Sequence, residues 1–263
     1  MKLIHCADLH LDSPLTSVFP GKMAVERRSE LLLNFFRLAD RAGEEGANAV
    51  LIAGDLFDSE VVSRSAADAV LSAVEGHPEI TFFYIRGNHD DAGFSLKNRV
   101  PENLRMFPEG KFASFHLGKG GAGIRVTGAE LPADGRTEES FWQSLRLDPR
   151  NYNIVLLHGL IADVKTGAPE ELPAEYLRNK GIDYLALGHI HKPSEGKLDA
   201  RGTYAYPGCL EARGFDEPGE HGFWLLDIDE ENMTMKRTFV PFARRIVHEV
   251  TVDVTGLSGT GEI

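Results

Sequence analysis

Seven side chains in the first 191 residues are of types that bind metal ions, and each of them follows an apolar segment. They are Asp8, His10, Asp55, Asn88, His158, His189 and His191. Residues i and i+2 of an extended segment point to the same side, so Asp8 pairs with His10 and His189 pairs with His191. Carboxylate, amide and imidazole groups without thiolate suit manganese, iron or zinc, and argue against calcium, which takes oxygen ligands. The pattern predicts a metal site with mixed oxygen and nitrogen ligands.

The number of ligands predicts two ions. Seven ligands exceed what one ion takes in a typical protein site, and they suit two divalent ions if one carboxylate bridges. Asp55 is the candidate bridge. Two dications, two aspartates and one hydroxide leave a single positive charge, which matches the single negative charge of a phosphodiester. Two metals about 3.5–4 Å apart lower the pKa of a shared water and stabilise both oxygens of an in-line displacement. We therefore predict hydrolysis of a phosphate ester.

Alternating strands and helices in the first 85 residues must position the first ligands. Strands are expected over residues 3–7, 49–53 and 80–85, with helices over 23–45 and 63–74. This order predicts parallel strands joined by right-handed crossovers. Sites in open α/β sheets are built at the carboxyl ends of the strands, which is where the Asp, Asn and His residues stand. Glycine beside several ligands permits sharp turns and close approach.

The second half contains more strands and shorter helices. Helices are expected over residues 138–145 and 174–179, and brief turns between strands favour antiparallel pairing. The expected strands cover residues 112–116, 124–127, 154–157, 184–187, 204–206, 223–228 and 233–239. Val250, Val252 and Val254 alternate with polar residues, which predicts a half-buried final strand. After it the sequence is either cut short or reaches a natural terminus. The whole is expected to be a mixed α/β sandwich.

Composition limits the classes of function. The chain has 263 residues and a formal net charge of −12, which argues against a surface that grips duplex DNA non-specifically. A local cationic site remains compatible with it, because bound metal ions are not in the formal count. Two cysteines, Cys6 and Cys209, are expected to be reduced thiols. No signal peptide or membrane span is expected, so the predicted location is cytoplasmic.

Each motif taken alone has an ordinary alternative. A single histidine after a strand is more often a capping or surface residue, and Gly87 with Asn88 is also typical of a turn. The ordered set is far more specific than its parts. A scaffold that binds metal without catalysis would need a broken motif, and none is found.

The quoted motifs resemble a known family. Asp8-Leu9-His10, Gly54-Asp55, Gly87-Asn88-His89-Asp90, His158 and Gly188-His189-Ile190-His191 are similar to the five motifs of calcineurin-like metallophosphoesterases. Finer features resemble the bacterial DNA-repair exonuclease branch, the SbcD-type nuclease subunits. These features are Ala7-Asp8-Leu9-His10-Leu11-Asp12, Gly54-Asp55-Leu56-Phe57-Asp58, Tyr206-Pro207-Gly208-Cys209 and Arg213-Gly214-Phe215-Asp216-Glu217.

The resemblance implies a fold and a role for each site residue. The fold is the metallophosphoesterase-type α/β/β/α sandwich, with two mixed sheets flanked by helices. Asp8, His10, Asp55 and His191 would hold one metal, and Asp55, Asn88, His158 and His189 the other. His89 would be the catalytic residue that is not a ligand, and Asp58 would orient it. The alternative for Asp58 is a carboxylate at a helix N-terminus.

The resemblance also implies a substrate and partners. It predicts a manganese-dependent 3′–5′ exonuclease acting on DNA ends, with endonuclease activity and a partner ATPase subunit, and it leaves homodimer formation open. The alternative substrate is a small nucleotide or another small phosphoester, which the acidic net charge favours. Residues 1–245 would form the nuclease domain, and residues 246–263 a strand and tail that begin a capping domain.

Two positions depart from relatives within the superfamily. Archaeal and eukaryotic repair nucleases carry histidine at the position of Asp58. Protein phosphatases carry Arg-Gly where this chain has Ser59-Glu60. A doubly charged monoester needs more cationic groups than a diester, so the missing arginine favours a diester.

Overall fold

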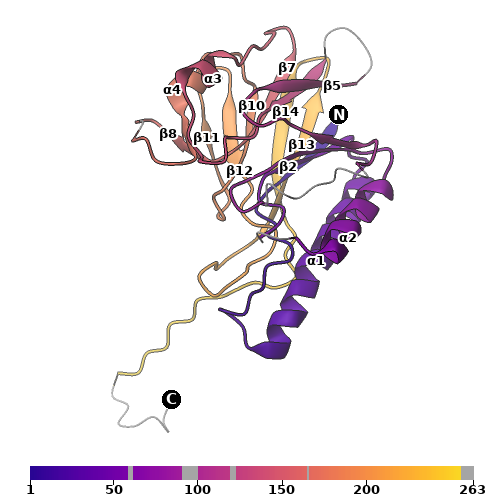
Figure 1. Cartoon of the computed structure of the whole chain (residues 1–263), viewed down its shortest axis with the longest axis vertical. Coiled ribbons are helices and arrows are strands. Elements are labelled where there is room, and N and C mark those ends of the chain that lie inside the picture. The colour runs from indigo at the N-terminus through magenta and orange to yellow at the C-terminus, as the bar shows by residue number, and fades with distance from the viewer. Residues whose placement is uncertain (59–61, 91–99, 119–122, 165, 256–263) are drawn as a thin grey trace.

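The computed structural model describes residues 1–58, 62–90, 100–118, 123–164 and 166–255. Its strands and helices appear in Figure 1. The strands of the first sheet are β1 (Lys2–Cys6), β2 (Ala49–Ala53), β3 (Thr81–Ile85), β4 (Leu104–Met106), β13 (Gly222–Asp229) and β14 (Thr234–Pro241). Those of the second are β5 (Ala113–Leu117), β6 (Ile124–Gly128), β7 (Tyr152–His158), β10 (Tyr184–Gly188), β11 (Ser194–Lys197) and β12 (Thr203–Tyr206). A small separate pair consists of β8 (Leu160–Ala162) and β9 (Glu171–Pro173).

Both large sheets are mixed. The first has the order β14-β13-β1-β2-β3-β4, with β1, β2, β3 and β4 parallel and β13 antiparallel to β1. The second has the order β11-β12-β10-β7-β6-β5. Its central strands β6, β7, β10 and β12 are parallel, whereas β5 and β11 pair antiparallel at the edges. The expected antiparallel pairing is therefore wrong for the centre of this sheet.

Helices cover the outer faces of both sheets. α1 (Gly21–Glu44) and α2 (Arg64–Glu75) pack on the first sheet, and α3 (Glu139–Gln143) and α4 (Ala174–Leu177) on the second (Figure 1). In α1, Leu31, Phe35 and Leu38 recur at helical spacing and are buried. Ser63 accepts the Ala66 N–H at the start of α2, as a helix N-cap does. The predicted α/β/β/α sandwich is confirmed.

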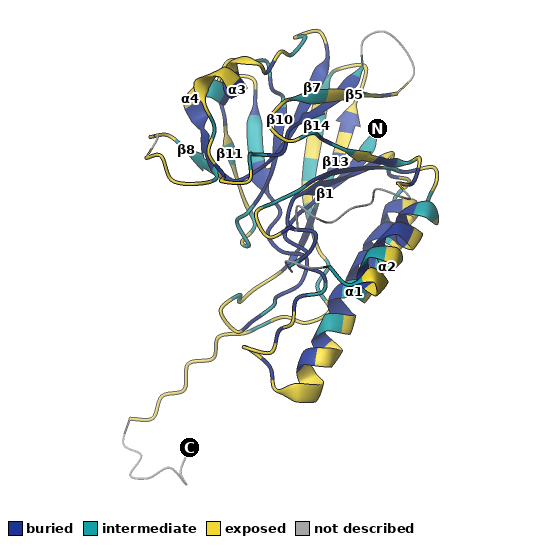
Figure 2. Ribbon diagram, viewed as in Figure 1, coloured by how far each residue is buried: buried dark blue, intermediate teal, exposed yellow. Residues whose placement is uncertain are grey.

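The inner faces of the two sheets share a core that holds the site rim together. Leu51 and Phe83 from the first sheet pack in one cluster with Ile154, Tyr184 and Ala186 from the second. Figure 2 shows the strands buried and the outward helix faces exposed. Because strands β1, β2, β3, β7 and β10 end on the same side of this core, the residues after them meet.

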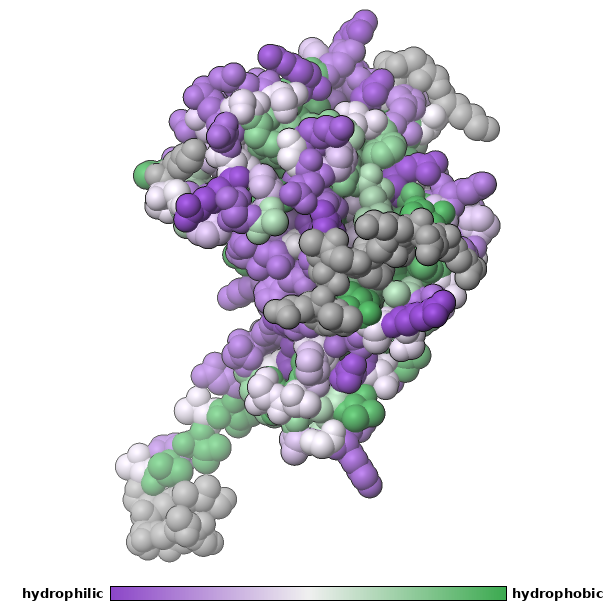
Figure 3. Space-filling view, in the orientation of Figure 1, coloured by the Kyte–Doolittle hydropathy of each residue, from purple (hydrophilic) through white to green (hydrophobic). Residues whose placement is uncertain are grey.

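The end of the chain differs from expectation. No strand forms over residues 250–254; Val250 is 77% exposed and Val252 64% exposed. Alternation alone does not make a strand, which needs a partner to satisfy its backbone groups. Figure 3 shows apolar atoms along this extended segment on an otherwise largely hydrophilic face. The domain boundary at residue 245 stays a prediction, and Ser59 and Glu60 lie outside the described residues.

Membrane insertion by a helix has no candidate in the described parts of the chain: their helices lack the length and apolar character needed to cross a bilayer.

Candidate metal centre

The first two ligand loops run side by side with strained backbones. Asp8, His10 and Asp55 have positive φ values of 53°, 47° and 50°. The Asp8 N–H donates to Gly54 O and the His10 N–H to Asp55 O, at 3.1 and 3.0 Å. Positive φ costs energy in residues other than glycine and is typical of functional sites. Here it turns the side chains toward the rim.

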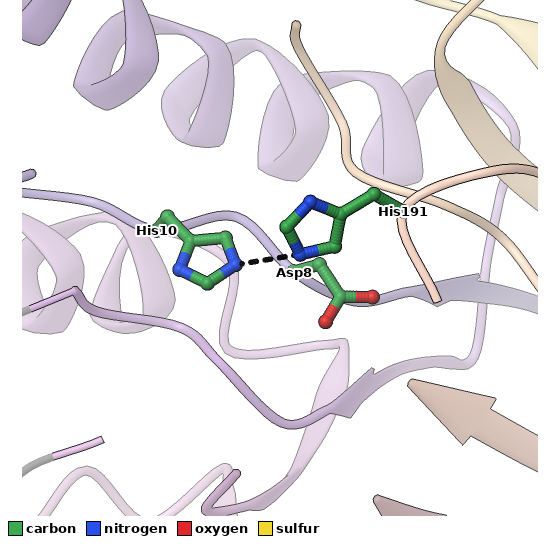
Figure 4. A group of neighbouring side chains, drawn as sticks. All are labelled: Asp8, His10 and His191. Carbon is green, nitrogen blue, oxygen red and sulfur yellow. Dashed lines mark hydrogen bonds between the residues drawn. The ribbon is translucent and has the colours of Figure 1, made fainter. Parts of the chain in front are cut away.

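His10 and His191 face one another across the first candidate ion position. Their Nε2 atoms are 3.1 Å apart, and the Asp8 carboxylate lies beside them (Figure 4). Asp8 also accepts the His189 N–H at 3.0 and 3.2 Å. One ligand atom from each of Asp8, His10 and His191 lies within 4.8 Å of the others. The structure thus brings these three predicted ligands together.

Asn88, His158 and His189 converge at the second candidate position. The Asn88 Oδ1 atom lies 2.9 Å from His158 Nε2 and 3.4 Å from His189 Nδ1. His158 Nδ1 donates to Ala53 O at 2.8 Å, which leaves the Nε2 lone pair free to bind a cation. Burial lowers the pKa of His158 to about 4, so its imidazole is neutral near pH 7.

Asp55 stands between the two positions. Its Oδ2 atom is 3.7 Å from His10 Nε2 and 3.5 Å from His158 Nε2. Its Oδ1 atom accepts the His89 N–H at 2.9 Å. A carboxylate shared between both ligand sets is in the place that a bridging ligand requires.

Two glycines make this convergence possible. A Cβ atom on Gly54 would lie 2.2 Å from His158 Nδ1, and one on Gly87 would lie 2.2 Å from Asp55 Oδ1. Any larger residue would displace a ligand, so both glycines are required by close approach.

The donor set fits two cations. Two ligands bound to one ion at about 2.1 Å lie on the order of 3 Å apart. Burial and the nearby Asp55 charge raise the pKa of Asp8 well above its usual range. Bound cations would favour the ionised carboxylates, because they supply the opposite charge that the buried site lacks.

His89 and Asp58 form a pair at the edge of the ligand sets. His89 Nδ1 is 3.0 Å from Asp58 Oδ1, and the His89 side chain is 49% exposed. The Asp58 carboxylate raises the pKa of His89, and the imidazoles of His10 and His89 lower the pKa of Asp58. Asp58 also accepts a hydrogen bond from Ser13 Oγ at 2.7 Å. It is a partner of His89 and not only a helix-terminal carboxylate.

Three further side chains, to which the motifs alone assigned no role, lie around the site. Asp90 accepts N–H groups from Leu56, Phe57 and Gly87 at 3.2, 2.7 and 2.8 Å, and so ties two ligand loops together. Arg213 Nη1 lies 3.2 Å from Asp58 Oδ2, and Glu217 contacts His191. All three belong to the quoted motifs, but nothing in their spacing shows which ligand each one touches.

A family model described as calcineurin-like phosphoesterase matches residues 1–193, which include every predicted ligand together with His89 and Asp58. The chain belongs to this family. Calcineurin-like phosphoesterases are metal-dependent hydrolases with a dinuclear metal site, and the clusters of His and Asp residues provide candidate ligands for it.

Curated relatives of this phosphoesterase include named nucleases. It is 30% identical to the uncharacterized metallophosphoesterase YhaO of Bacillus subtilis, over 87% of the chain and 57% of that relative. It is 26% identical to the DNA double-strand break repair protein Mre11 of Aeropyrum pernix, over 96% of the chain and 64% of the relative. It is also 26% identical to one polypeptide of the nuclease SbcCD of Staphylococcus epidermidis, over 92% and 69%. The chain thus spans 57–69% of the length of these relatives. Equal identity to the archaeal and the bacterial nuclease does not assign the phosphoesterase to either branch.

Solved structures share the fold. TT1561 of Thermus thermophilus has a TM-score of 0.53 at 13% identity, covering 90% of this chain and 98% of that one. A dimetal phosphatase from Danio rerio has a TM-score of 0.55 at 11% identity, covering 86% and 92%. At these identities the likeness supports the fold alone.

Proposed function

We propose that this phosphoesterase is a manganese-dependent phosphodiesterase that cuts DNA from its ends, as a 3′–5′ exonuclease with endonuclease activity. The observation that carries the proposal is the His89–Asp58 pair, 3.0 Å apart, beside a complete set of converging ligands. Relatives named as DNA-repair nucleases support DNA as the substrate. A partner ATPase subunit, a homodimer and a cytoplasmic location remain proposals.

The chain's own residues supply positioning and a proton. Asp8, His10, Asp55 and His191 would hold one ion, and Asp55, Asn88, His158 and His189 the other. When bound, two such ions supply a hydroxide nucleophile and neutralise the charge of the phosphate. Asp58 accepts the Nδ1–H of His89 and leaves Nε2 directed away from the pair. His89 then protonates the leaving oxygen or holds a phosphate oxygen from its exposed position.

Acidic side chains near the second ion position favour a second candidate, a small phosphodiester. A pocket of about 360 Å³ is lined by Asn88, His158, Arg86, Glu109 and Glu130. Arg86 lies 2.7 Å from Glu130 and 3.2 Å from Glu109, so its charge is already paired. Such walls repel a chain of phosphates more than a single diester.

Hydrolysis of two substrates by the same preparations tests both candidates. Wild type and His89→Ala would be assayed with manganese on bis(p-nitrophenyl) phosphate and on linear DNA labelled at either end. The proposal expects both substrates to be cut by wild type, 3′-labelled ends to be released first, and the variant to be inactive on each. His116→Ala is the matched control, because His116 is exposed on β5 and has no assigned role.

The outcomes separate the site from the substrate. Cleavage of the small diester alone would retain the metal centre and reject DNA for this chain. An active His89→Ala variant would reject the role of His89.

A further inference from the structure

Residues beyond 193, where the family model ends, surround one metal ligand. The Glu217 Oε1 atom is 2.6 Å from His191 Nδ1, and the Glu217 side chain is only 12% exposed. Cys209 N–H donates to His191 O at 3.1 Å. Both the ring and the main chain of His191 are therefore held by this later segment.

The tautomer of His191 follows from its two neighbours. Its Nε2 atom faces His10 Nε2 at 3.1 Å and is the atom placed to bind an ion. Its Nδ1 atom then carries the proton and donates it to Glu217. Arg213 Nη2, 3.2 Å from the same nitrogen, is itself a donor and cannot accept that proton. The carboxylate is thus the partner that fixes the ring.

Glu217 is itself held in place. Its Oε2 atom accepts the Arg213 N–H at 2.6 Å. Its backbone carbonyl accepts from His221 Nε2 at 3.0 Å, and His221 Nδ1 lies 3.1 Å from Cys209 Sγ. Because Cys209 also bonds the main chain of His191, these contacts close a ring around the ligand. The carboxylate has one well-defined position.

We propose that Glu217 is a positioning residue that sets metal affinity at the Asp8–His10–His191 position and not at the other. Outer carboxylates orient a histidine ligand and raise its basicity, and their loss costs about 10–100-fold in metal affinity or activity. The other position lacks this arrangement, because His158 Nδ1 bonds the main-chain carbonyl of Ala53. The inference concerns the metal centre and holds for either substrate proposed above.

Manganese titration of the metal-free protein tests this without any substrate. Glu217→Gln and Glu217→Ala would be followed by electron paramagnetic resonance and calorimetry. One of the two manganese affinities is expected to fall about 10–100-fold, with the other unchanged. Glu217→Gln keeps an acceptor for His191 but not for the Arg213 N–H, so its loss is the smaller. Saturating manganese is expected to restore hydrolysis of any substrate that wild type cuts.

Glu45→Gln is the matched control. Glu45 pairs with Arg41 and Lys2, and its side chain is 20% exposed. It lies beside the start of β1, at the opposite end of the strand from the site. Its substitution should leave both affinities unchanged. Equal weakening of both ions, or no weakening in either Glu217 variant, would overturn the proposal. Should the alanine variant fail to fold, the nearly isosteric glutamine variant decides.

Discussion

The two ion positions differ in what holds their imidazoles. At one, the Nδ1 atom of His191 lies 2.6 Å from a side chain, Glu217. At the other, His158 Nδ1 bonds a main-chain carbonyl, that of Ala53 in β2. A backbone acceptor exists wherever the sheet forms, whereas a side-chain acceptor depends on one residue. The first position can therefore be tuned by substitution, and the second is fixed by the fold.

Loss of the shared carboxylate should have the largest effect, because it removes the element common to both positions. Asp55→Asn is expected to lower kcat on the order of 10⁵-fold, since each ion contributes several kcal/mol and 1.36 kcal/mol is tenfold. Both manganese affinities should fall together. Steady-state rates and manganese titration measure this. If only one affinity falls, Asp55 is not a bridge.

His89→Gln should lower kcat by about 10²–10⁴-fold, the usual contribution of a positioned acid or base. Both manganese affinities should stay at the wild-type level, because His89 lies outside the two ligand sets. Rates and titration on the same preparation check the separation. A fall in manganese affinity would place His89 among the ligands.

Asp58→Asn should have a smaller effect, visible mainly in the pH profile. Asp58 raises the pKa of His89, so the imidazole stays protonated to higher pH in wild type. If the protonated form is active, kcat falls as pH rises through that raised pKa. Removing the carboxylate should move this alkaline limb to lower pH. Profiles of kcat at saturating manganese measure it, and an unmoved limb would argue against His89 as the acid.

The smallest effect concerns the contact between the sheets that carry the two positions. His5 in β1 lies 2.7 Å from Tyr184 Oη and 3.1 Å from Leu187 O in β10. Burial lowers the pKa of His5 from 6.5 to about 3. The unfolded chain therefore binds the proton first, and stability present above pH 6.5 is lost as pH falls toward 3.

The substitution His5→Gln should flatten that dependence by up to about 1.4 kcal/mol per pH unit. Urea unfolding of the metal-free protein at several pH values between 4 and 6.5 gives the two slopes. Equal slopes would mean that His5 does not remain neutral in the folded state.

Much of the site could be predicted because its ligands stand at strand ends. The boundaries of β1, β2, β3, β7 and β10 are marked by apolar runs, so the residues after them could be assigned to one rim before any coordinates. Asp90, Arg213 and Glu217 could not be given roles in this way. The last two lie in an irregular segment after β12, where no periodicity reports which ligand a side chain touches.

The fold was predicted less evenly than the site. The short strands β4, β8, β9 and β11 have three or four residues each and carry too little pattern to be recognised. Brief connections suggested hairpins, yet the centre of the second sheet is parallel. Its pairing depends on long-range packing against the first sheet. The valines of residues 250–254 alternate without a neighbouring strand, so their pattern leads to no strand in this chain.

Anomalous diffraction at the manganese edge, from crystals grown with manganese, tests the central claim most directly. Two peaks are predicted on either side of Asp55 Oδ2, about 3.5–4 Å apart. One should contact His10 and His191, and the other Asn88, His158 and His189. A single peak, or two peaks that do not share Asp55, would contradict the two-metal account.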